Sequence, residues 1–265
     1  MSSVVSLYDL NFKVWNEVVR LYHNDPIHHA YLIYDLIYEL DKTNVYFVLS
    51  NNRVASYILI WAGTQRLGIH LWGNDGSLVN KIPLMKDSII QLYNINVFDA
   101  ILGFLEDKGR IEVGYFMDML VDEEEFKPYR PEKAVRLKAK ESSHVKALMK
   151  LKEVQGRPLS EGLARERLNR WYYYGVFKEN ALVSIACAYL RLPEVWIIGD
   201  VFTHPEYRSR GYAKVVTSAV TRDAIVSGAK VLLHVKEGNI PAIKVYKALG
   251  YKVIGRRPWI FYKPE

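Results

Sequence analysis

The sequence has almost no cysteine and no long apolar run. Cys187 is the single cysteine among 265 residues. One thiol excludes an internal disulfide framework and a zinc cluster built on several cysteines. No apolar stretch reaches the roughly 18 residues of a membrane span. Asp9 and Glu17 stand where a secretory signal would be basic and then apolar. We therefore expect a cytoplasmic protein with no membrane association.

Metal-binding side chains are also sparsely grouped. His23, His28 and His29 lie close together in the sequence, but no carboxylate stands at a spacing that would complete a metal site. We interpret them as surface histidines and expect no metal cofactor. Cys187 lies within 184–189, a run typical of a strand, which indicates a buried and unreactive thiol.

Positive charge is scarce in the first half of the chain and abundant in the second. Residues 1–132 hold 11 Lys and Arg against 18 Asp and Glu, a net charge of −7. Residues 133–265 hold 25 against 11, a net charge of +14. A basic half suits a polyanionic partner such as nucleic acid, a membrane surface or a phosphorylated cofactor.

The net charge changes sign at a segment whose composition is typical of a domain linker. Residues 122–132 contain an acidic run and two prolines, Pro128 and Pro131. We therefore predict two domains, 1–125 and 133–265.

The second half alternates between strand and helix patterns. Apolar residues spaced three or four apart predict helices, and short β-branched and aromatic runs predict strands. The expected order is strand 134–139, helices around 145–152 and at 159–170, strands 172–178, 181–190 and 195–203, helix 211–227, strand 230–235, helix 239–249, and a last strand from Tyr251. This order predicts a mixed α/β domain.

One strand-to-helix loop has the features of an anion site. Residues 201–213 join a predicted strand to a predicted helix through Arg208, Arg210 and Gly211. Backbone N–H groups at a helix N-terminus have no intrahelical partner, and the helix dipole adds partial positive charge. The glycine would let a phosphate approach the backbone, so a pyrophosphate is the ligand that we expect.

These residues resemble a known signature. Arg208-x-x-Gly211-x-Ala213, preceded by Pro205-Glu206-Tyr207, is similar to the acyl-CoA-binding signature of the GNAT superfamily of N-acyltransferases. The resemblance continues through Leu233-His234-Val235, Asn239-Ile240-Pro241-Ala242 and Tyr246, and it covers about residues 133–265. It implies an α/β fold with a mixed, mostly antiparallel twisted sheet flanked by helices.

The resemblance also implies roles for individual residues around acetyl-CoA. Backbone groups of Val201, Phe202 and Thr203 would pair with pantetheine. Asn239 would contact the cofactor arm, and Ala242, being small, would let it pass. Tyr246 would lie beside the sulfur. Pyrophosphate would be held by the amides of Arg208, Ser209, Arg210, Gly211, Tyr212, Ala213 and Lys214.

The implied reaction is direct attack of an amine on the thioester. A base must accept the proton of the amine, and a hydroxyl such as that of Tyr246 can donate to the departing thiolate. Many family members carry a glutamate base six residues before the position of Thr203, where this chain has Ile197. His234 is the best substitute by chemistry. Asp200, Glu194 and His204 rank below it.

The first half gives a weaker signal for the same fold. Strands 45–49 and 54–61 form a predicted hairpin, 66–72 predicts a third strand, and 31–40 a helix. This order is similar to the start of the GNAT fold, but no Arg-x-x-Gly loop follows. We interpret 1–125 as a degenerate second copy, as in the glycine N-acyltransferase-like branch.

The sequence therefore predicts an N-acyltransferase that moves an acetyl group from acetyl-CoA to a primary amine. The acceptor, a small molecule or a peptide or protein amine, stays open, and so does a homodimer. The alternative is a catalytically weak acyl-CoA-binding module with a regulatory role, suggested by the missing glutamate. Nucleic-acid binding is not expected, because no nucleic-acid motif accompanies the charge.

Overall fold

The structure is a computed structural model that describes residues 3–63 and 66–265. The chain divides into two compact units, Met1–Met117 with Gly255–Glu265, and Asp118–Ile254. This division differs from the one expected at 122–132, because that segment packs within the second unit. The Lys127 N–H donates to the Leu249 carbonyl at 3.0 Å, and the Tyr129 N–H donates to Ser218 Oγ at 2.8 Å.

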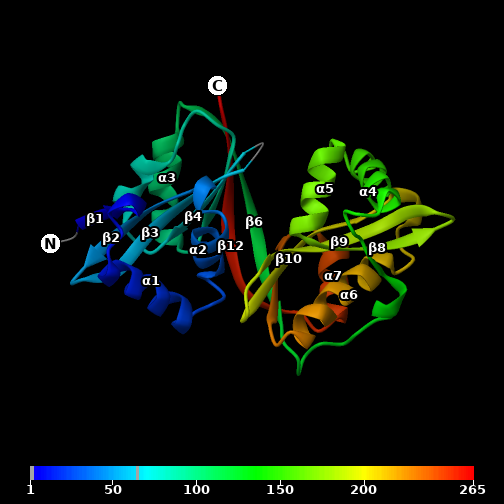
Figure 1. Cartoon of the computed structure of the whole chain (residues 1–265). Helices are drawn as coiled ribbons and strands as arrows, with labels where there is room; N and C mark the ends of the chain where they lie inside the picture. Colours follow the sequence, from blue (N-terminus) through cyan, green and yellow to red (C-terminus); the bar gives the residue numbers. More distant parts are fainter. Residues whose placement is uncertain (1–2, 64–65) are drawn as a thin grey trace. The chain divides into compact units, whose positions relative to one another are not determined.

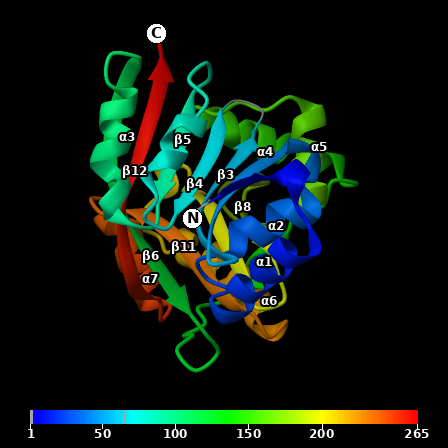
Figure 2. The ribbon, with the colours of Figure 1, turned by 90° about the vertical axis from the view of Figure 1, so that its left-hand side faces the viewer.

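The first unit is a sheet with helices on both faces. Helices α1 and α2 lie on one face and α3 on the other (Figure 2). The strand order is β1-β2-β3-β4-β5-β12, and β4 and β5 run parallel. The elements are β1 (Ser3–Ser6), α1 (Phe12–Asn24), α2 (Ala30–Tyr38), β2 (Thr43–Ser50), β3 (Arg53–Ala62), β4 (Leu67–Trp72), β5 (Ser88–Leu92), α3 (Phe98–Leu105), β6 (Gly109–Val121) and β12 (Lys252–Pro264).

The second unit has the same kind of architecture. Helices α4 and α5 lie on one side of the sheet and α6 and α7 on the other (Figure 1). The strand order is β11-β10-β9-β8-β7, antiparallel except for the β10–β11 pair. The elements are β7 (Val135–Arg136), α4 (Ser142–Val154), α5 (Glu161–Arg170), β8 (Tyr172–Lys178), β9 (Ala181–Arg191), β10 (Val195–Thr203), α6 (Tyr212–Val226), β11 (Lys230–Lys236) and α7 (Ile240–Ala248). The predicted mixed, mostly antiparallel sheet flanked by helices is confirmed.

The two units repeat one order of elements. Each runs strand, two helices, three strands, a connection, then strand, helix and strand. In the second unit the connection contains α6, a helix of 15 residues. In the first unit the same connection holds the short 3₁₀ helix Gly76–Lys81. The chain therefore carries two versions of one topology, which differ most where the anion site was predicted.

Local signals explain how the helices of the second unit begin and pack. The Asn239 side chain caps α7 by accepting from the Ala242 N–H at 3.3 Å, as the sequence predicted. Val216, Val220 and Ala224 on α6 are fully buried. Cys187 is also fully buried, and burial raises the pKa of its thiol, as expected of an unreactive cysteine.

One expectation about the first unit is wrong. His29 is not a surface histidine but is 2% exposed, with Nδ1 at 3.0 Å from the Tyr57 hydroxyl.

Among the residues that the structure describes, no helix combines the length and the apolar character that crossing a bilayer requires.

Candidate active site

The sheet of the second unit opens between β10 and β11. The two strands pair in parallel from Val195 to Ile198, whose partners are Lys230 to Leu233. Strand β10 continues to Thr203 and β11 to Lys236, so the strands part beyond Ile198. In the same stretch the register between β9 and β10 shifts, and Asp200 has a φ of +50°. This bulge bends β10 at the place where it leaves β11.

The predicted pantetheine residues line one side of the opening. Phe202 and Thr203 pair with β9 through one edge of the strand. Ser184 Oγ donates to the Phe202 carbonyl at 3.2 Å and lies 2.8 Å from Thr203 Oγ1, which further fixes that edge. The other edge of Val201, Phe202 and Thr203 faces the side on which β11 has departed. Backbone groups there can pair with an extended ligand as a neighbouring strand would.

His234 is the first residue of β11 beyond the last pair with β10. Its Nδ1 lies 2.6 Å from Asp118 Oδ1, and the two side chains are 4% and 7% exposed. Because a carboxylate accepts at this distance, Nδ1 carries the proton, and Nε2 is the basic nitrogen of the neutral ring. Asp118 lies on β6, 116 residues before His234. The sequence offered no local signal for this pair.

The predicted phosphate loop has the backbone geometry of an anion site. Ser209 and Gly211 both have positive φ, +59° and +80°, and Gly211 is the N-cap of α6. Left-handed residues in such a loop turn successive N–H groups toward one point. Arg208, Ser209 and Arg210 are exposed, and Arg208 Nε donates to the Thr203 carbonyl at 3.3 Å. The loop is therefore tied to the end of β10. The Arg208 N–H already donates to the Pro205 carbonyl at 3.2 Å, so the amides left for an anion are those that follow it.

Tyr129 is a residue of this site that the sequence analysis missed. A Cβ built on Gly211 would lie 3.4 Å from the Tyr129 hydroxyl, and Lys214 Nζ lies 3.9 Å from the centre of the Tyr129 ring. The hydroxyl therefore adjoins the first turn of α6. Tyr129 belongs to the segment that the sequence analysis interpreted as a linker, and its neighbours gave no sign of this contact.

Tyr246 lies on α7, the helix that follows β11. It is 6% exposed, and burial raises the pKa of its hydroxyl to about 12. Its ring packs near Tyr251, at 6.0 Å between centroids. Asn239 and Ala242 stand at the start of the same helix, where Asn239 is exposed and Ala242 half-buried. The candidate acid, the cofactor-arm residues and His234 thus come from two consecutive elements.

The other candidate bases are engaged elsewhere. The carboxylate of Asp200 accepts hydrogen bonds from Lys152, Gln155 and Tyr173. His204 Nδ1 accepts from the Glu206 N–H at 3.3 Å. Glu194 precedes β10 and lies at the end of the strand opposite to the opening. Ile197 is fully buried and offers no basic atom. Of the predicted bases, only His234 lies at the mouth of the opening with an orienting carboxylate.

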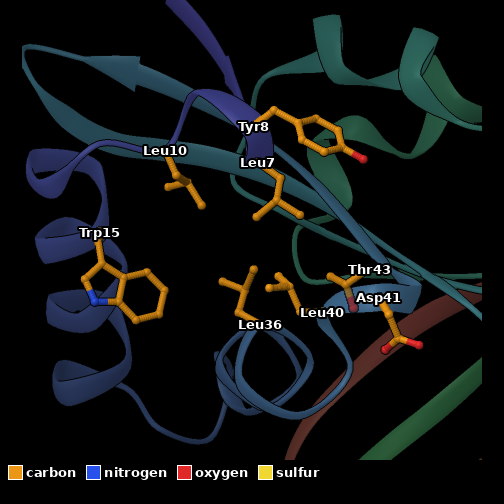
Figure 3. A pocket seen from close by; sticks show the side chains of 8 residues that line it. All are labelled: Leu7, Tyr8, Leu10, Trp15, Leu36, Leu40, Asp41 and Thr43. Carbon is orange, nitrogen blue, oxygen red and sulfur yellow. The ribbon is translucent and has the colours of Figure 1, made fainter.

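Two cavities in the described part of the chain lie away from these residues. The larger, of about 510 Å³, belongs to the first unit between α1, α2 and the start of the chain, with Trp15 and Leu36 among its apolar walls (Figure 3). A smaller one, of about 270 Å³, lies beside α4. Neither is lined by a candidate site residue. Within residues 3–63 and 66–265, no three His, Cys, Asp or Glu side chains gather as metal ligands.

Comparison with known proteins assigns a family description to this part of the chain. Residues 173–260 match the family of FR47-like proteins. No curated protein matches the chain.

Solved structures extend the similarity over nearly the whole chain. A Drosophila protein superposes with a TM-score of 0.69 at 15% identity, covering 94% of this chain and 95% of that one. A GCN5-related N-acetyltransferase-like protein from Streptococcus suis gives 0.65 at 16%, covering 94% and 100%. A tandem GNAT protein from the clavulanic acid biosynthesis pathway gives 0.62 at 13%, covering 100% of both chains.

The comparisons show the fold. The chain has the fold of solved structures described as GNAT acetyltransferases, and residues 173–260 match the FR47-like family. The likeness to the glycine N-acyltransferase-like branch remains a prediction.

Proposed function

We propose that the protein is an N-acetyltransferase that moves the acetyl group of acetyl-CoA to a primary amine in a ternary complex. The second unit, Asp118–Ile254, would supply the cofactor site, and the first unit would be a degenerate copy of the same fold. The observation that carries the proposal is the opening between β10 and β11, because it leaves a strand edge unpaired beside the loop that leads into α6.

The cofactor would extend from this loop along β10. The amides of 209–214 would hold the pyrophosphate, with the side chains of Arg208 and Arg210 supplying positive charge, since the Arg208 N–H already donates to the Pro205 carbonyl. The Tyr129 hydroxyl, which lies next to Gly211, would donate to a phosphate oxygen. Pantetheine would pair with the free edge of Val201–Thr203 and pass Asn239 and Ala242.

The His234–Asp118 pair would act as the general base in place of the glutamate that this chain lacks. Nε2 of the neutral ring would accept the proton of the amine, directly or through a water, while Asp118 holds Nδ1–H and stabilises the resulting imidazolium. The amine nitrogen bonds to the carbonyl carbon, and the carbon–sulfur bond then breaks. Free amides on the β10 edge would stabilise the oxyanion between these two events.

Tyr246 would act on the leaving thiolate. With a pKa of about 12, its hydroxyl stays protonated at neutral pH, whereas a thiol ionises near 8.5. Complete transfer from Tyr246 to the sulfur is therefore uphill, and the hydroxyl stabilises the developing charge by hydrogen bonding. The proton that finally reaches the sulfur is the one taken from the amine by His234.

Binding and turnover test the proposal in sequence. Calorimetry with CoA should show binding, and acetyl-CoA with a pooled library of amines should yield acetylated products by mass spectrometry. CoA binding without any product would favour the regulatory acyl-CoA-binding module, for which the absent glutamate is the specific argument. Absence of CoA binding would overturn both functions.

The role of His234 has its own signature. Replacing it with glutamine should lower kcat/KM by roughly 10², the lower range of general-base catalysis, and should remove the acidic limb of the pH profile. Asp118→Asn should show the same defect in weaker form, since an amide no longer enforces the Nδ1–H tautomer. His144→Gln, at a half-buried position on α4, is the matched control. Equal profiles for His234→Gln and wild type would reduce His234 to a structural residue.

A further inference from the structure

The bulge in β10 is built around a buried ion pair. Lys152 on α4 places Nζ at 2.8 and 2.9 Å from the two carboxylate oxygens of Asp200. Gln155 Nε2 donates to the same carboxylate at 3.1 Å, and the Tyr173 hydroxyl donates to it at 2.6 Å. The Lys152 side chain is 1% exposed and that of Asp200 is 13% exposed. Three side chains from α4, its C-terminal end and β8 thus converge on one residue of β10.

The strained backbone of Asp200 and the buried ammonium of Lys152 depend on each other. The φ of Asp200, +50°, is unfavourable for any residue with a side chain, although aspartate adopts it more readily than most. Burial lowers the pKa of Lys152, and the Asp200 carboxylate opposes that shift. An ammonium is retained at such a depth only with an anionic partner. The ion pair therefore holds Asp200 in the bulge, and the bulge brings the carboxylate to the lysine.

The first unit shows what happens without this cluster. Its parallel strands begin pairing at Leu67 and Ser88 and stay paired to Leu71 and Leu92, where β5 ends. The register between β3 and β4 has no shift. Five residues after its first paired residue, β4 has Trp72, whereas β10 has Asp200 five residues after Val195. In the first unit β4 thus ends one residue after its last pair with β5, and no unpaired edge extends beyond the pairing as it does in β10.

We infer that the Lys152–Asp200 ion pair, supported by Tyr173 and Gln155, opens β10 away from β11 and so positions the strand edge that receives the pantetheine arm. The inference rests on the function proposed above. Asp200 is a positioning residue and not the base, because its carboxylate oxygens already accept from three side chains. Its effect reaches the cofactor through the backbone of Val201–Thr203.

The decisive variant removes the anchor without leaving a buried charge. Lys152→Met combined with Asp200→Ala should keep the fold but let β10 pair further along β11. CoA affinity should fall at least tenfold. Affinity for 3′-phospho-ADP, which has the pyrophosphate but no pantetheine, should not change. Lys152→Met with Asp200→Asn is the rescue, since asparagine tolerates positive φ and can still bond to Tyr173. It should recover part of the lost affinity.

Amide exchange reports the opening without any ligand. Amides in 199–203 should exchange more slowly in the alanine double variant, because they gain partners on β11. Glu161→Gln, which removes an exposed ion pair on α5, is the control and should change nothing. If the alanine variant does not fold, Tyr173→Phe removes one donor and should lower CoA affinity about threefold, with 3′-phospho-ADP unaffected.

The outcomes separate this inference from the function. Wild-type protein that fails to bind CoA would overturn the proposed function, and the exchange data would still decide the role of the cluster. Wild-type CoA affinity and wild-type exchange in the folded alanine variant would overturn the inference. The inference is equally overturned if only Tyr173→Phe folds and it binds CoA as wild type does.

Discussion

The two units share an order of elements and even a spacing, yet only one of them opens. Strand β5 begins pairing at Ser88 and β11 at Lys230. Counted from these positions, Leu92 stands where His234 does, and Phe104 stands where Tyr246 does. The residue before α3 is Val97, which makes no side-chain cap, where α7 has Asn239.

The comparison shows that the fold and the chemistry depend on different residues. The first unit keeps its buried apolar positions, including Leu92 and Ile101, and so keeps the sheet and helix. It lacks the imidazole, the phenol, the cap and the long helix that the second unit places around its opening. Burial of apolar side chains is enough to maintain this topology, even in a unit that lacks the polar groups of a reactive site.

The largest contrast should come from a charge at the start of α6. Gly211→Glu places a side chain at φ +80° and a carboxylate where the pyrophosphate would bind, so CoA affinity should fall at least about 100-fold. Isothermal titration calorimetry with CoA measures this affinity. Gly211→Asn tolerates the backbone conformation and adds no charge, so it should lose less CoA affinity than Gly211→Glu. Gly76→Glu makes the matching change in the first unit, where the added Cβ meets only Ala100 at 3.8 Å, and should have no effect. Unchanged CoA binding by Gly211→Glu would refute the site.

Tyr246→Phe would make α7 resemble α3 at the key position. Turnover should fall by roughly 10²–10³, the effect of losing one hydrogen-bond donor to a developing charge, while CoA affinity stays nearly constant because the ring remains. Steady-state kinetics and calorimetry on the same samples separate the two quantities. Tyr251→Phe is the matched control, since it loses the 2.6 Å contact with Thr221 Oγ1 and about 1 kcal/mol of stability, but no reacting group. If both variants turn over alike, Tyr246 is a packing residue.

The first unit should be the acid-sensitive one. Burial lowers the pKa of His29 to about 4, below the roughly 6.5 of an unfolded histidine. The folded state thus binds fewer protons, and stability from neutral His29 is fully present above about pH 6.5 and lost as pH falls toward 4. The loss is on the order of 3 kcal/mol.

Urea unfolding at several pH values, followed by fluorescence, measures that loss. His29→Gln should be less stable at neutral pH but should lose less stability on acidification. His23→Gln, at an exposed position on α1 of the same unit, should follow wild type. Identical pH slopes for His29→Gln and wild type would show that another group carries the acid sensitivity.

Much of the second unit was predictable because its signals are local. Arg208, Gly211 and Asn239 act through backbone conformation and helix termini a few residues away, so their spacing indicates the structure directly. The contacts of Asp118, Tyr129 and Lys152 join residues from 48 to 116 positions apart. Nothing in their neighbourhoods marks those partners. His29 was misplaced for the same reason, since its burial depends on Tyr57 and Trp72.

The sequence by itself determined the order of elements, the loop into α6 and the choice of His234 and Tyr246 as candidates. These follow from periodicity, glycine and caps, which act within a few residues. Tertiary structure alone decided that β10 parts from β11 after Ile198, that Asp118 orients His234, and that Asp200 holds a bulge with Lys152. These polar contacts are strong because their groups are removed from water, and that happens only when segments distant in the sequence have packed together.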